Sequence, residues 1–268
     1  MSETAPTENL LDRPRDLEAE SWVQPRLGSP IRGYIMLIPS WVIAFLHMTF
    51  MLLCTFSPFV MRRWRGPVMR GWGKLQCLIY GVKLDIHGLE HRDTPGPKIL
   101  LINHVSIFDL FLFSSLCPDN AVVIYKKEFH KIPVMGWLMA RLGFIAVDRQ
   151  NRAAAIDSVD RAARTVREKS LALFVAPEGT RSRKGGLQKF KLGPFHMALQ
   201  TKVPLVPTIH RGTEMCQPHG RFIVRPGVVR VDFLPPIPTV DWDARKVRHR
   251  VKEVREYFLR YLPEEKKD

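Results

Sequence analysis

The longest uncharged segment of the chain, residues 33–61, most limits the folds that this protein can adopt. It reads GYIMLIPSWVIAFLHMTFMLLCTFSPFVM and contains 29 residues without a charged side chain. A bilayer core about 30 Å thick requires about 20 apolar residues as a helix, and the stretch between Pro39 and Pro58 nearly reaches that length. A buried core helix is the alternative, but such helices are usually shorter and keep a polar stripe. The segment therefore predicts a membrane anchor.

The residues that follow, 60–80, have the spacing of an amphipathic helix. One face comprises Met61, Trp64, Val68, Trp72, Leu75 and Ile79, and the other Arg62, Arg63, Arg70 and Lys74. This pattern predicts a helix at the headgroup boundary, with its arginines toward lipid phosphates. The sequence leaves open whether residues 33–80 form one span plus a surface helix or a helical hairpin in one leaflet. The basic cluster predicts that this end lies in the cytoplasm.

The charge balance favours an anionic partner. Lys and Arg number 41 against 26 Asp and Glu, a net charge of +15, which suits nucleic acid, an anionic membrane surface or phosphorylated small molecules. Nucleic-acid binding would leave the apolar segment without a role, and no block interleaves aromatic residues with Lys and Arg, so we expect no nucleic acid. The cysteines lack CxxC spacing and the histidines lack HExxH spacing, so we expect neither a disulfide framework nor a metal site.

Beyond residue 81 short apolar runs alternate with helical patterns, which predicts an α/β domain over residues 82–268. We divide the remainder into a polar tail at 1–30, loose or weakly helical, and the anchoring segment at 31–81. The predicted strands are KILLI (98–102), AVVIY (121–125), LALFV (171–175) and PLVPTI (204–209), and the predicted helices cover 151–169 and 241–262. Residues 221–234 read as two strands joined by a Pro-Gly turn. We therefore expect a mixed, largely parallel central sheet flanked by helices.

Two polar sets follow two of the predicted strands. LINHVSIFDL places His104 and Asp109 five positions apart after one strand. After another strand, LALFVAPEGTRS presents Glu178, Gly179, Thr180 and Arg181. Ligands of α/β folds bind at the carboxyl ends of strands; glycine permits close approach of the backbone, and the planar arginine fork suits phosphate. A surface ion pair between Glu178 and Arg181 is the alternative interpretation.

Four blocks resemble a known family. NHVSIFD resembles the HxxxxD motif of the glycerolipid acyltransferases, and PEGTRS resembles their glycerophosphate-binding block. KKEFHKIPVMGWLMARLGFIAVDR and VPLVPTI are similar to two further blocks of the 1-acyl-glycerol-3-phosphate acyltransferases. The order and spacing of the blocks agree over residues 98–210, and the amino-terminal anchor is also similar to that group.

The resemblance implies transfer of a fatty acyl group from coenzyme A or acyl carrier protein to the sn-2 hydroxyl of lysophosphatidate, giving phosphatidic acid without a cofactor. His104 would act as the general base, because neutral imidazole is poised to accept a proton near pH 7. Asp109 would fix its tautomer and stabilise the imidazolium. The phosphate would meet Arg149, Arg181 and Lys127, with Lys126 as the alternative to Lys127. Gly179 and Thr180 would belong to the same site, and Glu178 would accept from the glycerol hydroxyl.

Other interpretations remain open at this point. Ser106 or Cys117 could form a covalent acyl-enzyme, and Arg149 could pair with Asp148 or cap a helix. The acceptor could be another lyso-lipid, such as a lyso-ornithine lipid or a lysophospholipid, or the chain could be a membrane lipid-binding protein without catalysis. We expect membrane lipids as partners and an active site on the cytoplasmic face of a bacterial inner membrane or its equivalent.

Overall fold

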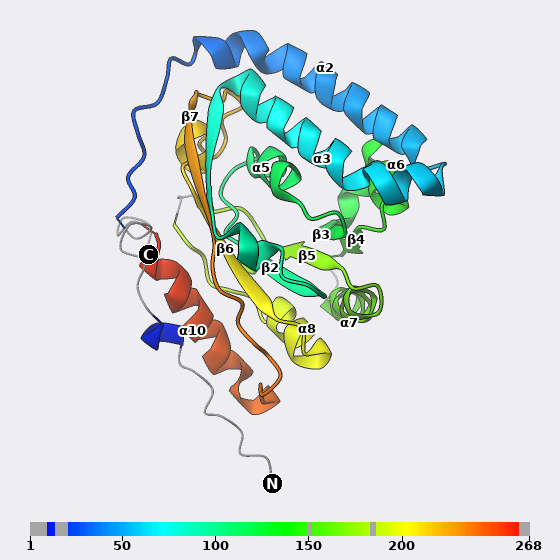
Figure 1. Ribbon diagram of the computed structural model, residues 1–268, viewed down its shortest axis with the longest axis vertical. Helices are drawn as coiled ribbons and strands as arrows, with labels where there is room; N and C mark the ends of the chain where they lie inside the picture. The colour runs from blue at the N-terminus through cyan, green and yellow to red at the C-terminus, as the bar shows by residue number, and fades with distance from the viewer. Residues whose placement is uncertain (1–9, 14–20, 149–151, 183–185, 263–268) are drawn as a thin grey trace.

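A seven-stranded sheet forms the centre of the protein in a computed structural model, which describes residues 10–13, 21–148, 152–182 and 186–262 (Figure 1). The strands are β1 (Val82–His87), β2 (Lys98–Ile102), β3 (Ala121–Lys126), β4 (Ile145–Val147), β5 (Ala172–Val175), β6 (Leu205–Arg211) and β7 (Gly227–Phe233). Their order in the sheet is β1-β7-β6-β2-β5-β3-β4. All neighbours are parallel except β6 and β7. The predicted mixed, largely parallel sheet is confirmed.

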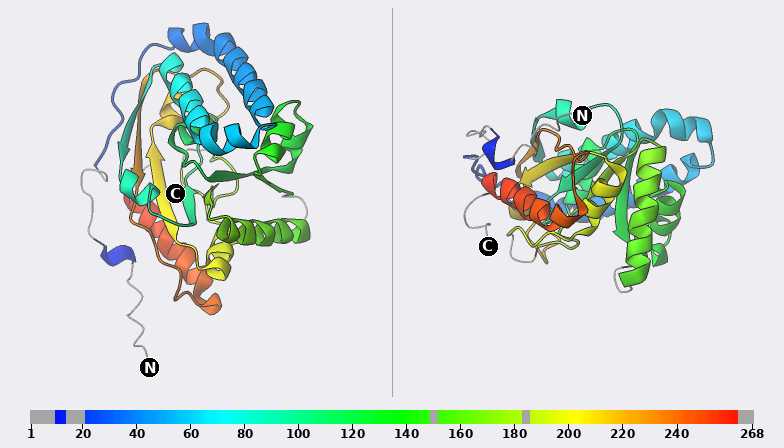
Figure 2. Two further views of the ribbon diagram at one scale, coloured as in Figure 1. Left: turned by 45° about the vertical axis from the view of Figure 1, so that its right-hand side comes forward. Right: turned by 90° about the horizontal axis from the view of Figure 1, so that it is seen from below.

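Helices cover both faces of the sheet (Figures 1 and 2). The α-helices are α2 (Ile31–Cys54), α3 (Pro58–Tyr80), α4 (Leu89–Arg92), α5 (Asp109–Leu116), α6 (Met135–Arg141), α7 (Arg152–Glu168), α8 (Gly193–Thr201), α9 (Thr213–Cys216) and α10 (Val247–Arg260). Short 3-10 helices are η1 (Leu10–Asp12), η2 (Lys127–Lys131) and η3 (Ala244–Lys246). Side chains of β2 alternate between the faces: Ile99 and Leu101 join the core under α7, α8 and α10, whereas Leu100 joins the core under α3 and α5.

The hairpin expected within residues 221–234 does not form. Residues 221–226 lie outside any strand, and β7 pairs antiparallel with β6 and parallel with β1. Two of the apolar residues before the Pro-Gly pair lie against α2 instead: a Cβ built on Gly33 would lie 2.1 Å from the Val224 carbonyl oxygen and 2.9 Å from Cγ2 of Ile223, and Val224 is buried. The sheet is therefore mixed because of the β6–β7 pair and not because of a local turn.

Helices α2 and α3 pack side by side as a helical hairpin, and the choice between a full span and a hairpin in one leaflet stays open. The Ser40 hydroxyl donates to the Gln76 side-chain oxygen over 2.6 Å, and the His47 ring stacks on Trp72 with ring centroids 4.9 Å apart. At the other end, Arg32 donates to the Ile79 carbonyl in the last turn of α3. Buried polar pairing and ring stacking therefore fix α2 against α3 along its length.

Helix α3 packs one face against the domain, while Arg62, Arg63 and Trp64 near its start are exposed, so its place at the headgroup boundary stays a prediction. Trp72 contacts Phe111 of α5 edge to face with ring centroids 5.3 Å apart, so it does not face lipid. Arg70 pairs with Asp119 at 2.6 Å and donates to a backbone carbonyl, so it does not extend freely toward lipid phosphates either. The sequence periodicity predicted the apolar face of this helix, but its buried face includes residues 66, 73, 77 and 80. Gly66 and Gly73 lack side chains there, which allows α5 and the loop after it to pack closely against α3.

We expect Gly73→Ala to destabilise the fold, because a Cβ there would lie 2.2 Å from the Ser115 backbone nitrogen of α5. Overpacking of this kind costs about 1–3 kcal/mol. Gly71→Ala is the matched control in the same helix: its Cβ would meet nothing within 4 Å, so its higher helix propensity should add up to about 1 kcal/mol of stability. Thermal unfolding of both purified variants in detergent measures the difference; equal midpoints would contradict the close α3–α5 packing.

The described part of the amino-terminal tail contacts the domain. Leu10 is buried, and its backbone N–H donates to the Glu253 carboxylate of α10 over 2.9 Å. The guanidinium of Arg211 lies over the Trp22 ring, 5.4 Å from its centroid. The loose tail that we expected is therefore held against the domain at these residues.

Candidate active site

The carboxyl ends of β2, β5 and β6 lie at one edge of the sheet, because β2 is parallel to both of its neighbours. The NHVSIFD segment follows β2, the PEGTRS segment follows β5, and His210 lies near the end of β6. Lys127 follows β3, which is parallel to β5. Asp148 follows β4, which is parallel to β3. Topology thus gathers most of the predicted site residues at the edge where ligands of parallel sheets bind.

His104 and Asp109 are hydrogen-bonded to each other. The His104 Nδ1 atom lies 2.7 Å from Asp109 Oδ2, which also accepts the backbone N–H groups of Val105 and Ser106 at 2.9 and 3.0 Å. Asp109 is fully buried at the first residue of α5, whereas 32% of the His104 side chain is exposed. In the part of the chain that the structure describes, His104 Nε2 has no hydrogen-bond partner. With Nδ1 donating to Asp109, Nε2 is available as a base.

The pKa of Asp109 is held well below its usual value. Burial alone would raise it, but the nearby His210 ring and the hydrogen bond from His104 outweigh burial. Asp109 is therefore a carboxylate throughout the neutral range. A fixed carboxylate at Nδ1 selects one tautomer of His104 and favours its charged form once it accepts a proton.

His210 is a site residue that the sequence analysis missed. Its Nε2 atom lies 3.0 Å from Asp109 Oδ1, and its side chain is fully buried. The Asn103 side chain holds the same residue at the backbone, donating to the His210 carbonyl and accepting its N–H. The strand expected from the sequence covers 204–209, whereas β6 extends to Arg211 and so includes His210. A strand one residue longer would have indicated a histidine at the same sheet edge as His104.

The PEGTRS loop is bound to both sides of His104. Glu178 Oε1 accepts the His104 N–H over 3.0 Å, and the Ser182 N–H donates to the His104 carbonyl over 3.0 Å. Glu178 Oε2 accepts the N–H of Gln188, and the carboxylate is almost fully buried. Burial raises the pKa of Glu178, and the two backbone hydrogen bonds oppose this increase only in part. We therefore revise the role of Glu178 from an acceptor for the glycerol hydroxyl to a residue that fixes the loop beside His104.

The short loop at 179–181 lies between those two attachments. Gly179 has φ +72°, and a Cβ there would lie 2.8 Å from Cδ and Cε of Lys191, a cation that the sequence analysis also missed. Thr180 is exposed and Arg181 is partly exposed. Over the residues described, Lys191 forms no ion pair, so its ammonium group is available beside the loop. Lys191 could have been found from the sequence, because the KFKLG segment that contains it follows PEGTRS closely.

The other predicted phosphate ligands are less closely connected to His104. Lys127 is exposed on η2, and its Nζ lies 3.5 Å from Asp148 Oδ2. Lys126, the alternative, pairs with Glu128 at 3.2 Å. Arg149 lies outside the described residues, so its predicted role stays a prediction.

Neither candidate for a covalent acyl-enzyme is suited to that role. The Ser106 hydroxyl is buried, donates to the Gln217 carbonyl over 2.9 Å and accepts the Phe108 N–H. Burial raises the pKa of the Cys117 thiol to about 11, which disfavours the thiolate. No three His, Cys, Asp or Glu side chains are grouped as a metal site would require among the residues that the structure describes.

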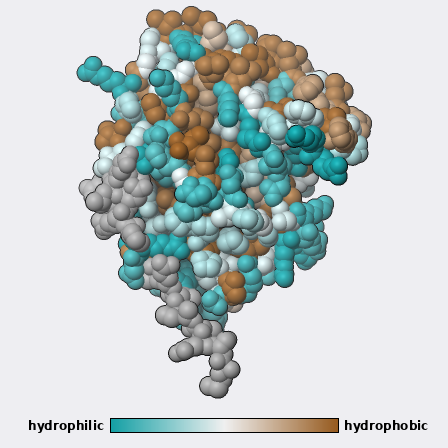
Figure 3. Space-filling model, viewed as in Figure 1, coloured by the Kyte–Doolittle hydropathy of each residue, from teal (hydrophilic) through white to brown (hydrophobic). Residues whose placement is uncertain are grey.

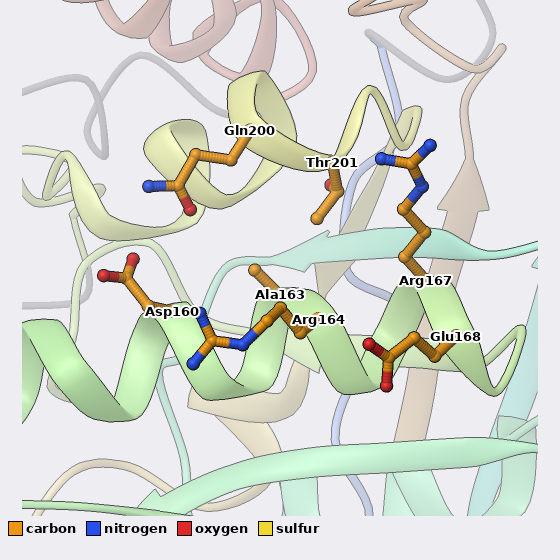
Figure 4. Close-up of a pocket in the computed structure, with 7 residues that line it drawn as sticks. All are labelled: Asp160, Ala163, Arg164, Arg167, Glu168, Gln200 and Thr201. Atoms are coloured by element: carbon orange, nitrogen blue, oxygen red, sulfur yellow. The ribbon is translucent and has the colours of Figure 1, made fainter.

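A groove of about 610 Å³ lies elsewhere, between α7 and α8 (Figure 4). It is lined by Asp160, Ala163, Arg164, Arg167, Glu168, Gln200 and Thr201. Both signs of charge line it, and it contains none of the residues that surround His104.

Comparisons with known proteins identify relatives of this chain and of its fold. Residues 83–211 match the family model described as Acyltransferase. The 1-acyl-sn-glycerol-3-phosphate acyltransferase of Limnanthes douglasii is 42% identical over 195 residues, which cover 73% of this chain and 69% of that protein. The protein of the same name from Saccharomyces cerevisiae is 32% identical over 189 residues, covering 70% of this chain and 62% of that protein. The crystal structure of the 1-acyl-sn-glycerophosphate acyltransferase from Thermotoga maritima has the same fold, with a TM-score of 0.72 at 24% identity, over 84% of this chain and 93% of that one.

Proposed function

The chain belongs to the 1-acyl-sn-glycerol-3-phosphate acyltransferase family, and we propose that it transfers a fatty acyl group from a thioester carrier to the sn-2 hydroxyl of lysophosphatidate, giving phosphatidic acid. The observation that carries the proposal is the buried Asp109 carboxylate 2.7 Å from His104 Nδ1, together with the hydrogen bond from the His104 backbone N–H to Glu178 of the PEGTRS loop. The carrier is coenzyme A or acyl carrier protein, both of which present the same thioester. No cofactor is required.

The reaction needs a base and a positioned acceptor. His104 Nε2 accepts the proton of the sn-2 hydroxyl as its oxygen attacks the thioester carbonyl, forming a tetrahedral intermediate. When the intermediate collapses, the carbon–sulfur bond breaks, and the His104 imidazolium returns the proton to the departing thiolate. Asp109 stabilises the imidazolium between these steps, and general catalysis of this kind contributes about 10²- to 10⁴-fold. Direct transfer fits the commitment of the Ser106 hydroxyl to structural hydrogen bonds.

Cations beside His104 bind the phosphate of the acceptor. Arg181 lies in the loop whose ends are hydrogen-bonded to His104, and Lys191 lies across Gly179 of the same loop. Arginine supplies a planar pair of donors and lysine a point charge, a combination that suits a phosphate monoester. Lys127 and Arg149 would extend this site from the ends of β3 and β4.

We expect Arg181→Ala to raise the KM for lysophosphatidate about 10- to 100-fold with little change in the KM for the acyl donor, because a charge-assisted contact is lost. Arg181→Lys should recover only part of the loss, since lysine cannot bind two phosphate oxygens side by side. Arg167→Ala, which removes an exposed arginine from α7, is the matched control. Steady-state kinetics with each substrate varied in turn measures the split; equal effects on both KM values would indicate a folding role instead.

The acceptor itself is tested by a panel of lyso-lipids. Purified enzyme would be assayed with lysophosphatidate, lysophosphatidylcholine and lyso-ornithine lipid, each with acyl-coenzyme A and acyl carrier protein as donors. The proposal expects the highest kcat/KM for lysophosphatidate, whose phosphate monoester alone carries two negative charges near neutral pH. Equal turnover of an acceptor without that group would favour the alternative lyso-lipid acyltransferase.

The enzyme acts, in our proposal, at the cytoplasmic face of a membrane such as the bacterial inner membrane. Among the described residues one helix, α2, is long and apolar enough to cross a membrane by length and composition, and only 17% of its most apolar stretch is buried. Figure 3 shows hydrophobic side chains concentrated over the end of the molecule that α2 occupies. The exposed apolar residues of α2 are Ile31, Tyr34, Ile35, Ile38, Trp41, Val42, Phe45, Leu46, Phe50 and Leu53. A lipid surface is the partner that such a face fits.

A further inference from the structure

Asp109 is contacted by two histidines from different parts of the chain. His104 reaches Oδ2 from the loop after β2, and His210 approaches Oδ1 from β6, with Nε2 at 3.0 Å. Three donors already serve Oδ2, namely His104 Nδ1 and two backbone N–H groups. In the described part of the chain Oδ1 has no partner that meets hydrogen-bond geometry, and His210 Nε2 lies 3.0 Å from it. The two oxygens of this buried carboxylate therefore depend on different partners.

The surroundings of His210 select its tautomer. Its side chain is fully buried, and the Phe113 ring meets it edge to face with ring centroids 5.5 Å apart. Nδ1 has no hydrogen-bond partner among the described residues, whereas Nε2 faces the Asp109 carboxylate. A proton on Nδ1 would be a buried donor without an acceptor, which is costly, so the neutral ring carries its proton on Nε2.

The approach of Nε2 to Oδ1 is close but not aligned as a hydrogen bond, and neither atom has a partner that meets that geometry. A small rotation of the imidazole would direct its N–H at the oxygen. Hydrogen bonds of catalytic groups are commonly poorly aligned without substrate and tighten in the complex. Asp109 Oδ1 is a buried acceptor, His210 Nε2 is a buried donor, and the two atoms lie 3.0 Å apart. Because buried polar atoms are normally hydrogen-bonded, we expect these two atoms to pair with each other.

We propose that His210 is a positioning residue, which donates from Nε2 to Asp109 Oδ1 and thereby holds the carboxylate in the orientation that presents Oδ2 to His104. This inference rests on the proposed role of His104 as the base. Without the donor, Oδ1 would be a buried charged atom with no partner, and the carboxylate would rotate or take up water. Either change disturbs the tautomer and orientation of His104 without touching the substrates.

Four titratable groups meet at this point. Asp109 and Glu178 contact His104 from α5 and from the loop after β5, and His210 faces Asp109 from β6. Loss of the His210 donor frees the carboxylate to turn, which weakens the Asp109–His104 hydrogen bond and should lower kcat without changing either KM.

Three substitutions of His210 separate donation from packing. His210→Leu removes the donor and fills the space, and we expect kcat to fall about 10- to 100-fold with both KM values nearly unchanged. His210→Gln places an amide N–H near the position of Nε2 and should stay within about threefold of the wild type. His210→Asn, equally polar but shorter, reaches only the position of Nδ1 and should resemble the leucine variant. Thermal unfolding of each variant shows whether the fold is kept.

Nuclear magnetic resonance of ¹⁵N-histidine-labelled full-length enzyme gives a readout that does not depend on turnover. The Nδ1 proton of His104 should resonate far downfield in the wild type and in His210→Gln. In His210→Leu this downfield shift should be smaller, because the hydrogen bond to Asp109 is weaker. Wild-type kcat in His210→Leu would overturn the proposal, as would a glutamine variant as defective as the leucine variant. If the wild type acylates no lyso-lipid while the resonance responds as expected, the proposed function fails and the positioning role stands.

Discussion

Replacing His104 by alanine is expected to lower kcat by about 10²- to 10⁴-fold, because the sn-2 hydroxyl then has no group that can accept its proton as it attacks. Binding of lysophosphatidate should change little, since the imidazole acts in the transition state and the proposed phosphate ligands are intact. Turnover of the purified variant measures the first effect, and calorimetric titration with lysophosphatidate measures the second. Near-normal turnover would remove His104 from the mechanism.

Two neighbouring substitutions control this result. Asp109→Asn should also lower kcat strongly, by up to about 10⁴-fold, because an amide favours the wrong tautomer of His104. Its thermal stability must be measured alongside, because Asp109 Oδ2 also accepts two backbone N–H groups. Ser106→Ala should keep most activity, since the Ser106 hydroxyl is occupied with Gln217 and Phe108. A serine variant as inactive as His104→Ala but normally folded would favour the acyl-enzyme alternative.

The sequence predicted strands best where both faces of the strand are buried. KILLI was expected at 98–102 and forms Lys98–Ile102, because an uninterrupted apolar run suits a central parallel strand covered on both sides. The same reasoning failed at 221–224, where apolar residues lie against α2 although no strand pairs with them. Local patterns report which residues are buried, but the partner that buries them depends on the tertiary arrangement.

The sequence predicted those site residues that belong to a local motif, but not those that only the fold brings together. His104 and Asp109 were paired from their spacing after a strand, and the structure brings them within hydrogen-bond distance. His210 was missed because its proximity to Asp109 follows from β6 lying beside β2, an adjacency between strands more than a hundred residues apart in sequence. Glu178 was expected to contact substrate because PEGTRS resembles the glycerophosphate-binding block of the family. Only the structure reveals that backbone N–H groups occupy both of its oxygens.

The double substitution Ile38→Glu with Phe45→Glu is expected to release the enzyme from membranes. Both side chains are more than half exposed on α2, seven residues apart and so on the same face. Burying each in lipid contributes about 1.5–3 kcal/mol, and a charge in its place opposes insertion, so the change far exceeds the ~1 kcal/mol expected from reversing an exposed arginine such as Arg62. Membrane sedimentation measures release. Activity on lysophosphatidate in bilayers should fall at least about tenfold, whereas a short-chain, water-soluble acceptor should be used nearly as before.

Substitution is a sharper test than truncation of residues 1–80, because α3 supplies Cys77 and Tyr80 to the domain core and its removal would unfold the site as well. Val240→Glu is the control for a glutamate at an exposed apolar residue: it places one such charge before α10, on a surface formed by other elements. That variant should remain in the membrane pellet. If the α2 double variant also stayed there and used both acceptors normally, the lipid contact would have to lie on α3, where the exposed large apolar residues are Phe59, Trp64, Leu75 and Leu78. The face of α2 would then need a different partner, because a surface of this size and composition is unfavourable in water.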